Sequence, residues 1–335
     1  MRKYNKDDYL FACAGMVYRE KYLLTQEKID KMLESKTPDE AMKVLFELDY
    51  GEADESVPAT EFESLLSGEL KKTYDIIKQA TPEQAYFEIL LYPNDYHNVK
   101  ALLKAEFLGI NASELLVDAG SIPVNVLIDM VRNRDFINMR TDMAKAISEV
   151  LEIYALTQDP QVVDLILDKA CFNDMSLLAK ELEIDFIKEY LALKIDVSNL
   201  ITFIRLREIK RPREFFSKVF IENGNISENV FLGGYDEAME QFAEKLAVYG
   251  LRDVLFEGAA MIKATGRFTE LEKLCDNVLM AYIDEAKYMT TGIEPLFAYF
   301  AAKESEIKTI RIIMAGKLAG ISTDMIRERI RDTYV

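Results

Sequence analysis

The stretch YHNVKALLKAEF, residues 96–107, shows the pattern that decides the fold of this 335-residue chain. Its apolar residues recur at spacings of three and four, as in an amphipathic helix, at Val99, Leu102, Leu103, Phe107 and, just beyond it, Ile110. The preceding Tyr92-Pro93-Asn94-Asp95 is a typical turn sequence, so we expect a helix to begin near His97.

The same spacing extends over most of the chain. Thr37-Pro38-Asp39-Glu40 and Thr81-Pro82-Glu83-Gln84 each combine a Thr cap, a Pro at the first helical position and an acid or amide three residues after the cap. Asp159-Pro160 is a weaker signal of the same kind. Breaks are expected at Asn223-Gly224-Asn225, at Gly233-Gly234 and near Gly292, and residues 49–59 are typical of a loop. Alternating apolar and polar strands of useful length are absent, so the sequence predicts an all-α protein.

Composition excludes several classes of function. Lys and Arg number 41 against 58 Asp and Glu, a net charge of −17 that argues against nucleic acid and against anionic lipid as partners. Cys13, Cys171 and Cys275 are far apart, which favours buried thiols in a reducing compartment. No run approaches the roughly 20 apolar residues of a membrane span. We therefore expect a soluble intracellular chain.

His97 is the only histidine. A zinc site needs three or four ligands, and a Ser-His-Asp site needs an activated nucleophile nearby. Phosphate-binding and dinucleotide-binding glycine motifs are also missing: residues 315–322 contain Gly316-Lys317, but Leu318 follows. We therefore expect His97 to cap or pack a helix, and we expect no catalytic residue, no metal, no cofactor and no small-molecule substrate.

A pair of elements returns about every hundred residues. Lys104, Arg205 and Lys303 each follow apolar residues one, two and five positions earlier, and Arg19 is a looser fourth copy. The first two copies are preceded by the same short motif, Asp95-x-x-Asn98 and Asp196-x-x-Asn199. We expect the acid of each motif to cap the helix N-terminus. The second element is an Ile followed by Pro or Ser and then Asn or Asp, as in SIPVNVL (121–127), NISENVF (225–231) and GISTDMI (320–326).

These elements predict a three-fold duplicated helical domain of about 100 residues, divided near 1–110, 111–215 and 216–335, with boundaries that can be permuted. A cation after an apolar stripe packs its aliphatic stem while its charge meets solvent or a carboxylate. The repeated cations are therefore either architectural or partner contacts, and the pattern leaves both interpretations open.

Three segments resemble a known family: NDYHNVKALLKAEFLGI (94–110), YREKYLLTQEKIDKMLES (18–35) and, most specifically, LFAYFAAKESEIKTIRIIMAGKLAGIS (296–322). The family is the central-stalk adaptor of V-type ATPases, known as the C subunit in prokaryotic enzymes and the d subunit in vacuolar ones. The resemblance runs the whole length of the chain. In the last segment the family's characteristic residues are expected at Glu304, Glu306, Arg311, Gly316, Lys317 and Gly320.

The resemblance implies a mechanical, non-catalytic role. In that family three similar helical domains surround a pseudo-three-fold axis and form a funnel. Its base lies on the cytoplasmic side of the membrane rotor ring of proteolipid subunits, and its mouth receives the central shaft, made of the D and F subunits. The ring carries either H⁺ or Na⁺. The alternatives are a free-standing helical interaction scaffold and an acidic helical enzyme with a carboxylate site.

The C-terminal segment differs in charge from the rest of the chain. Residues 303–335 hold seven Lys or Arg and five Asp or Glu, a charge of +2, which leaves −19 for the remainder. We expect these C-terminal helices to pack against the helix that carries Arg19.

Overall fold

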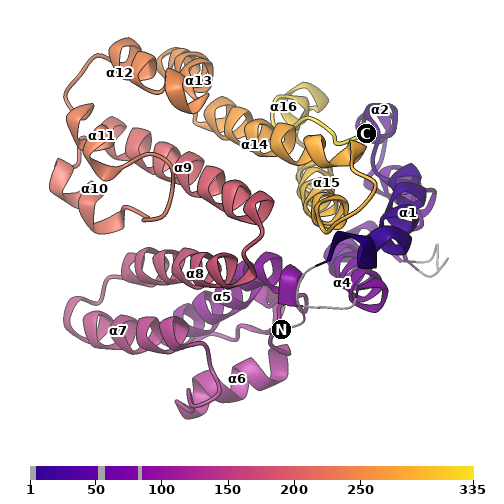
Figure 1. Cartoon of the computed structure of the whole chain (residues 1–335), viewed down its shortest axis with the longest axis horizontal. Coiled ribbons are helices and arrows are strands. Elements are labelled where there is room, and N and C mark those ends of the chain that lie inside the picture. The colour runs from indigo at the N-terminus through magenta and orange to yellow at the C-terminus, as the bar shows by residue number, and fades with distance from the viewer. Residues whose placement is uncertain (1–4, 52–56, 82–84) are drawn as a thin grey trace. The chain divides into compact units, whose positions relative to one another are not determined.

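The computed structural model describes residues 5–51, 57–81 and 85–335. Within these ranges the chain is helical, with no strand, so the all-α prediction is confirmed (Figure 1). The chain divides into two compact units: unit 1 comprises residues 1–84 and 239–335, and unit 2 comprises residues 85–238. Both ends of the chain thus belong to unit 1, whereas the middle folds as unit 2.

Unit 1 is organised around one long helix. Its α-helices are α1 (Leu10–Arg19), α2 (Gln26–Glu34), α3 (Pro38–Phe46), α4 (Phe62–Ala80), α12 (Met239–Lys245), α13 (Arg252–Thr265), α14 (Thr269–Asp284), α15 (Glu294–Leu318) and α16 (Thr323–Arg327). Helix α15 packs against α1, α3, α4, α14 and α16. It is therefore the central helix, and it contacts elements from both ends of the chain.

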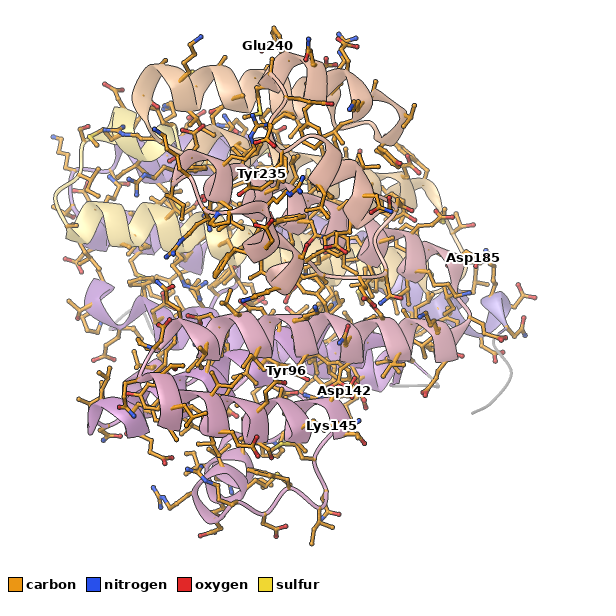
Figure 2. All side chains as sticks on the ribbon, turned by 90° about the vertical axis from the view of Figure 1, so that its left-hand side faces the viewer. Tyr96, Asp142, Lys145, Asp185, Tyr235 and Glu240 are labelled. Carbon is orange, nitrogen blue, oxygen red and sulfur yellow. The ribbon has the colours of Figure 1, made fainter. Side chains whose placement is uncertain are left out.

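Unit 2 contains α5 (Ala85–Leu108), α6 (Val124–Asn133), α7 (Thr141–Thr157), α8 (Gln161–Leu182), α9 (Asp185–Glu208), α10 (Arg213–Val219) and α11 (Glu228–Gly233). Helix α8 packs against α5 and α7 and is followed after a tight turn by α9. Figure 1 shows α5, α7 and α8 side by side. Asp142 and Lys145, labelled in Figure 2, form an ion pair one turn apart on α7.

Of the two predicted helix starts that lie within the described residues, the one at Thr37 occurs as expected. The Thr37 hydroxyl accepts from Glu40 N (3.1 Å), Pro38 is the first residue of α3, and the Glu40 carboxylate accepts from Lys36 N (2.8 Å). At the start of α8 the cap residue is Pro160 and not the expected Asp159, although the Asp159 carboxylate accepts from Gln161 N (2.9 Å). Residues 82–84 of the third predicted start lie outside the described residues, as do residues 52–56 of the predicted loop.

The predicted break at residues 92–95 is wrong. Helix α5 runs without interruption from Ala85 to Leu108, with Pro93 inside it, so His97 lies in the middle of a helix. A proline removes one helical hydrogen bond and crowds the preceding turn, which costs about 3 kcal/mol or more. Tyr92 and Tyr96, on either side of Pro93, are buried, and α5 packs against both α6 and α8. This tertiary packing offsets the local cost.

The long helices are buried on more than one face. Helix α15 buries apolar residues such as Phe297, Phe300 and Ile310, and it also buries the charged residues Lys303 and Glu306. A helix that is apolar around most of its circumference belongs in the interior of a protein. The polar groups on such a helix must therefore find partners inside the protein.

The described residues contain no helix that is both long and apolar enough to cross a membrane. The division into domains at 1–110, 111–215 and 216–335 stays a prediction.

Candidate functional site

A buried network of hydrogen bonds in unit 2 joins the middle of α5 to the loop that follows it. Asn98 Nδ2 donates to Val117 O (2.9 Å), and Val117 N donates to Asn98 Oδ1 (2.8 Å). Ile122 N donates to Asp95 Oδ1 (3.0 Å), and the Ser121 hydroxyl donates to Asp95 Oδ2 (2.6 Å). Asp95 and Asn98 are both fully buried. Two side chains of one helix thus hold the loop backbone at both ends of residues 117–122.

Arg140 supplies the charge that balances Asp95. Its guanidinium donates to Asp95 Oδ2 (2.9 Å), lies 3.4 Å from Asp174 Oδ2, and stacks on the Tyr92 ring at 3.9 Å from the ring centroid. Tyr96 donates to Asp174 (2.7 Å), and burial raises the pKa of both Tyr96 and Asp174. A buried carboxylate is tolerated where it is paired and hydrogen-bonded. Arg140 therefore links the loop-binding pair on α5 to α8.

The same arrangement recurs in the middle of α9. Asn199 Nδ2 donates to Ile221 O (2.8 Å), and Ile221 N donates to Asn199 Oδ1 (3.0 Å). Asp196 accepts from Ile226 N (2.9 Å) and from both the backbone and side-chain nitrogens of Asn225 (3.0 and 2.9 Å). Burial raises the pKa of Asp196 above its ordinary value, and the hydrogen bonds from these donors offset only part of that rise. The two pairs therefore bind the backbone of their loops in the same way.

Both acids were expected to cap the N-terminus of their own helix, and that interpretation is wrong. Asp95 lies ten residues after the start of α5, and Asp196 lies eleven residues after the start of α9. The N–H groups from which they accept belong instead to the following loop. The amides at mid-helix are already bonded within the helix, so a buried acid there must take its donors from another segment.

Each loop needs a glycine where it meets the acid. A Cβ on Gly120 would lie 2.1 Å from Asp95 Oδ1, and one on Gly224 would lie 2.4 Å from Asp196 Oδ1. Real Cβ atoms essentially never make contacts this short. The segments VDAGSI (117–122) and IENGNI (221–226) therefore share one motif for one physical reason.

Replacing Gly120 or Gly224 with Ala should lower the free energy of unfolding by about 1–3 kcal/mol, because the new methyl group displaces a buried carboxylate from its donors. Gly233→Ala is the matched control in the same unit, since nothing lies within 4 Å of its Cβ position. Urea denaturation of the three variants measures the difference. Equal midpoints for G120A, G224A and G233A would show that the loop does not depend on the close approach.

Unit 1 holds a different cluster in the middle of α15. Lys303 is 1% exposed, its ammonium donates to Glu306 Oε1 (2.7 Å), and it lies 3.8 Å from Glu69 Oε1 of α4. Glu306 also accepts from the Tyr50 hydroxyl and from Leu24 N, both at 2.5 Å. Leu24 belongs to the loop before α2. Glu306 therefore binds a loop backbone, as the Asn residues of α5 and α9 do.

Glu69 completes the cluster. Burial raises the pKa of Glu69 above its ordinary value, and the nearby Lys303 and Lys72 offset only part of that rise. Lys72 lies 3.5 Å from Glu69 Oε2 and donates to Asp49 Oδ2 (3.0 Å). Burial, and then the nearby Glu306, raise the pKa of Tyr50 well above its ordinary value, so the phenol stays protonated and donates. The cluster ties α15, α4 and two loops together.

The three repeated cations differ in their position along the helix. Lys104 and Arg205 lie near the C-terminal ends of α5 and α9, whereas Lys303 lies nine residues after the start of α15. Counted from the start of its helix, Lys303 lies at about the same position as Asp95 in α5 and Asp196 in α9. The similarity between the three long helices thus lies in their buried mid-helix polar groups.

The other predicted repeat residues lie in several places. Lys104 is half-buried and pairs with Asp164 of α8 (2.7 Å), and Arg205 is exposed. Arg19, at the end of α1, lines a cavity of about 200 Å³ together with Lys303 and Glu69. Glu304 is half-buried on α15. The structure thus brings Arg19 and Lys303 together in unit 1.

The cations of the C-terminal segment hold the beginning of the chain. Arg311 makes two hydrogen bonds to the Glu63 carboxylate of α4 (2.7 and 2.9 Å). Lys317 donates to Leu33 O (3.0 Å) and Ser35 O (2.7 Å), so it caps the C-terminus of α2. The predicted contact between the C-terminal helices and the Arg19 helix is confirmed, because α15 packs against α1.

Gly316 is explained by the packing of α16 on α15. A Cβ on Gly316 would lie 2.7 Å from the Ile326 side chain. Ile326 is the last residue of the GISTDMI segment (320–326), and it is buried on α16. The glycine therefore allows the two helices to approach.

The sequence reasoning missed Arg140 and Glu69. Each acts on a residue far away in the sequence, and no local spacing marks it. Gly120 and Gly224 did have a signal, because each stands two residues before the repeated Ile.

His97 is exposed, and its Nε2 lies 3.0 Å from Leu115 O. No group of three or more His, Cys, Asp or Glu in the described part of the chain has the geometry of a metal site. Within each buried cluster the side chains bind loop backbone or other side chains of the same cluster, an arrangement that holds segments together.

Lys303→Met should destabilise the protein by about 3–5 kcal/mol, because it leaves the buried Glu306 without a cation and Glu69 with only the part-exposed Lys72. The loss should shrink as the pH falls from 7 to 5. Burial already raises the pKa of Glu69, the loss of Lys303 raises it further, and protonation of Glu69 then removes one of the two buried negative charges. Chemical denaturation at both pH values measures this.

Lys104→Met is the control, because its pair with Asp164 is 37% and 44% exposed and such pairs contribute about 1 kcal/mol or less. Similar losses in both variants, or a loss at Lys303 that does not depend on pH, would contradict the assigned role of the cluster.

The fold and these clusters define an all-helical protein in which buried polar residues on long helices fix the loops. The chain belongs to the ATP synthase (C/AC39) subunit family, whose model matches residues 12–329. It is thus a member of a family of rotary ATPase subunits.

Similar proteins include the C subunit of the V-type sodium ATPase of Enterococcus hirae, 25% identical over 94% of this chain and 96% of that protein. The C subunit of the V-type ATP synthase of Thermus thermophilus is 25% identical over 97% of this chain and 98% of its own length. The C subunit of the A-type ATP synthase of Methanocaldococcus jannaschii is 24% identical over 95% of this chain and 85% of its own length.

Proposed function

We propose that this protein is the non-catalytic central-rotor subunit of a V-type ATPase or ATP synthase. It links the central shaft, the D and F subunits, to the membrane rotor ring of proteolipid subunits and transmits rotation for ATP-coupled proton or sodium transport. The observation that carries the proposal is the family match over residues 12–329, with relatives named as C subunits that align over nearly their whole length.

The buried clusters support a mechanical role. A coupler under torque must keep its loops fixed to its helices, since slack in either would let the rotor slip. Asp95 and Asn98 hold one loop at several backbone atoms, and Asp196 and Asn199 hold another. These bonds are buried, so opening them leaves unsatisfied polar groups at a cost of about 1–3 kcal/mol each. Stiffness of this kind suits a rotor part.

The proposed location is the cytoplasmic face of the membrane, with the protein peripheral to it. The net charge of −17 disfavours adsorption to anionic lipid, so attachment would come from the ring subunits. The proposed arrangement is three similar helical domains around a pseudo-three-fold axis, forming a funnel that receives the shaft. The recurrence of loop-binding polar groups on α5, α9 and α15 supports three repeats.

Affinity isolation of the tagged protein from mildly solubilised membranes tests the proposal. We expect the D and F subunits and the proteolipid ring subunits to be recovered with it in fixed proportion. An untagged strain processed in parallel gives the background. Recovery of the chain alone, or with soluble proteins unrelated to an ATPase, would favour a free-standing scaffold instead.

Removing residues 304–335 should abolish shaft binding by unfolding unit 1. The deletion takes away most of α15, including Glu306, Arg311 and Lys317, which hold α2, α4 and two loops. The loss of that packing exceeds the ~5–15 kcal/mol stability of a typical domain. Circular dichroism and binding to the isolated shaft measure the result. A truncated chain that is folded and binds the shaft at wild-type affinity would be inconsistent with this role of α15.

A further inference from the structure

Helix α1 is apolar on two opposite faces. One face, which includes Cys13 and Met16, is buried in unit 1, where α1 packs against α15 and α4. The opposite face carries Leu10, Phe11 and Val17, which are 57%, 89% and 52% exposed. A helix that is apolar around its whole circumference is normally covered on every side. The exposed side of α1 therefore has the character of a contact surface.

The apolar stripe ends in two phenols. Tyr18 and Tyr22 are 58% and 40% exposed, and their hydroxyl oxygens lie 3.3 Å apart. Leu10, Phe11, Val17, Tyr18 and Tyr22 recur at spacings of four and seven residues, so they point to the same side of the helix. We call these five side chains the outer face of α1.

Two cations stand at the phenol end of the outer face. The Lys21 ammonium lies 5.3 Å from the centroid of the Tyr18 ring. Arg19 lines the cavity of about 200 Å³ in unit 1, together with Tyr18 and Tyr22. Within the described residues neither Arg19 nor Lys21 forms an ion pair. Both charges are therefore available to an anion that approaches this end of α1.

The acids of the same cavity already have cations. Asp49 pairs with Lys72 at 3.0 Å, and Glu69 lies 3.5 Å from Lys72 and 3.8 Å from Lys303. These pairs belong to the cluster in the middle of α15. They leave the guanidinium of Arg19 uncompensated.

The beginning of the chain also differs in charge from the remainder. Residues 1–22 hold five Lys or Arg and three Asp or Glu, a charge of +2, which leaves −19 for the other residues. The net charge of −17 disfavours adsorption of the chain as a whole to an anionic surface. A local contact depends instead on the charges within a Debye length, about 10 Å at 0.1 M salt.

We propose that the outer face of α1 lies on the lipid surface beside the rotor ring. Phe11 and its apolar neighbours enter the apolar region of the lipid, and Arg19 and Lys21 bind the phosphates of anionic phospholipids. An apolar helix face that ends in tyrosines and cations has the composition of a segment at a membrane–water interface. A phospholipid also offers an apolar chain and a negative group side by side, as the stripe and its two cations require. The inference rests on the proposed function, which brings the protein to the membrane, and the contact adds to attachment by the ring subunits.

Flotation of the purified full-length protein with vesicles tests the apolar part of the contact. The vesicles contain phosphatidylcholine with phosphatidylglycerol. We expect Phe11→Asp to lower the partition coefficient about tenfold or more, as loss of one buried apolar side chain implies. Ile137→Asp is the matched control, because Ile137 is also 89% exposed but belongs to unit 2. No binding by the wild-type chain, or equal losses in both variants, would overturn the inference.

Lys21→Gln tests the electrostatic part. We expect binding to vesicles with phosphatidylglycerol to fall about fivefold, as for one cation near an anionic surface, and binding to phosphatidylcholine alone to stay the same. Lys43→Gln removes the same charge from an exposed position on α3. Equal effects of K21Q and K43Q would mean that overall charge, and not the end of α1, governs the binding.

Photo-crosslinking identifies the occupant in the assembled complex. A photoreactive phenylalanine analogue replaces Phe11, and we expect mass spectrometry to find a phospholipid attached at this position. An adduct with a protein of the complex in place of lipid would overturn the inference and assign the outer face to that protein. Val17→Asp replaces F11D in the vesicle experiment if circular dichroism shows that F11D is not folded.

The two proposals fail separately. Recovery of the other ATPase proteins from solubilised membranes, without vesicle binding or a lipid adduct, overturns the lipid contact alone. Vesicle binding by the purified chain, with no other ATPase protein in the isolate, overturns the proposed function.

Discussion

The structure depends on buried polar side chains in the middle of its long helices. A helix interior has no free backbone donors, so Asp95, Asn98, Asp196 and Asn199 are satisfied only by segments outside their helices. Each pair therefore fixes one loop in one position. A loop that fails to reach its pair leaves a buried carboxylate without donors, which lowers the stability of the folded protein.

In unit 1 the buried polar side chain in the middle of the long helix is a cation, which also needs partners from outside its own helix turn. Lys303 occupies that position, and Glu306 and Glu69 neutralise it. The cluster connects segments from both ends of the chain, because Leu24 and Tyr50 precede Glu306 by 282 and 256 residues. It therefore joins the N-terminal and C-terminal parts into one unit. In the proposed rotor role, the buried ion pairs would resist torque together with the apolar packing.

The internal repeat also shows where the two copies in unit 2 differ. The longer loop after α9 allows α10 to form and to bury Phe216. The shorter loop after α5 leaves an open groove at the corresponding place. A small difference in loop length thus accompanies the difference between a closed aromatic core and an open groove.

The sequence by itself determined the helical class, the Thr37 cap and the recurrence of Asp-x-x-Asn, because periodicity, capping and short motifs are local properties. Only the tertiary structure decided that α5 continues through Pro93, that the acids bind loops and that Lys303 is buried between carboxylates. Each of these depends on partners distant in the sequence, since packing against α6 and α8 offsets the cost of Pro93, and burial decides which charges must be paired.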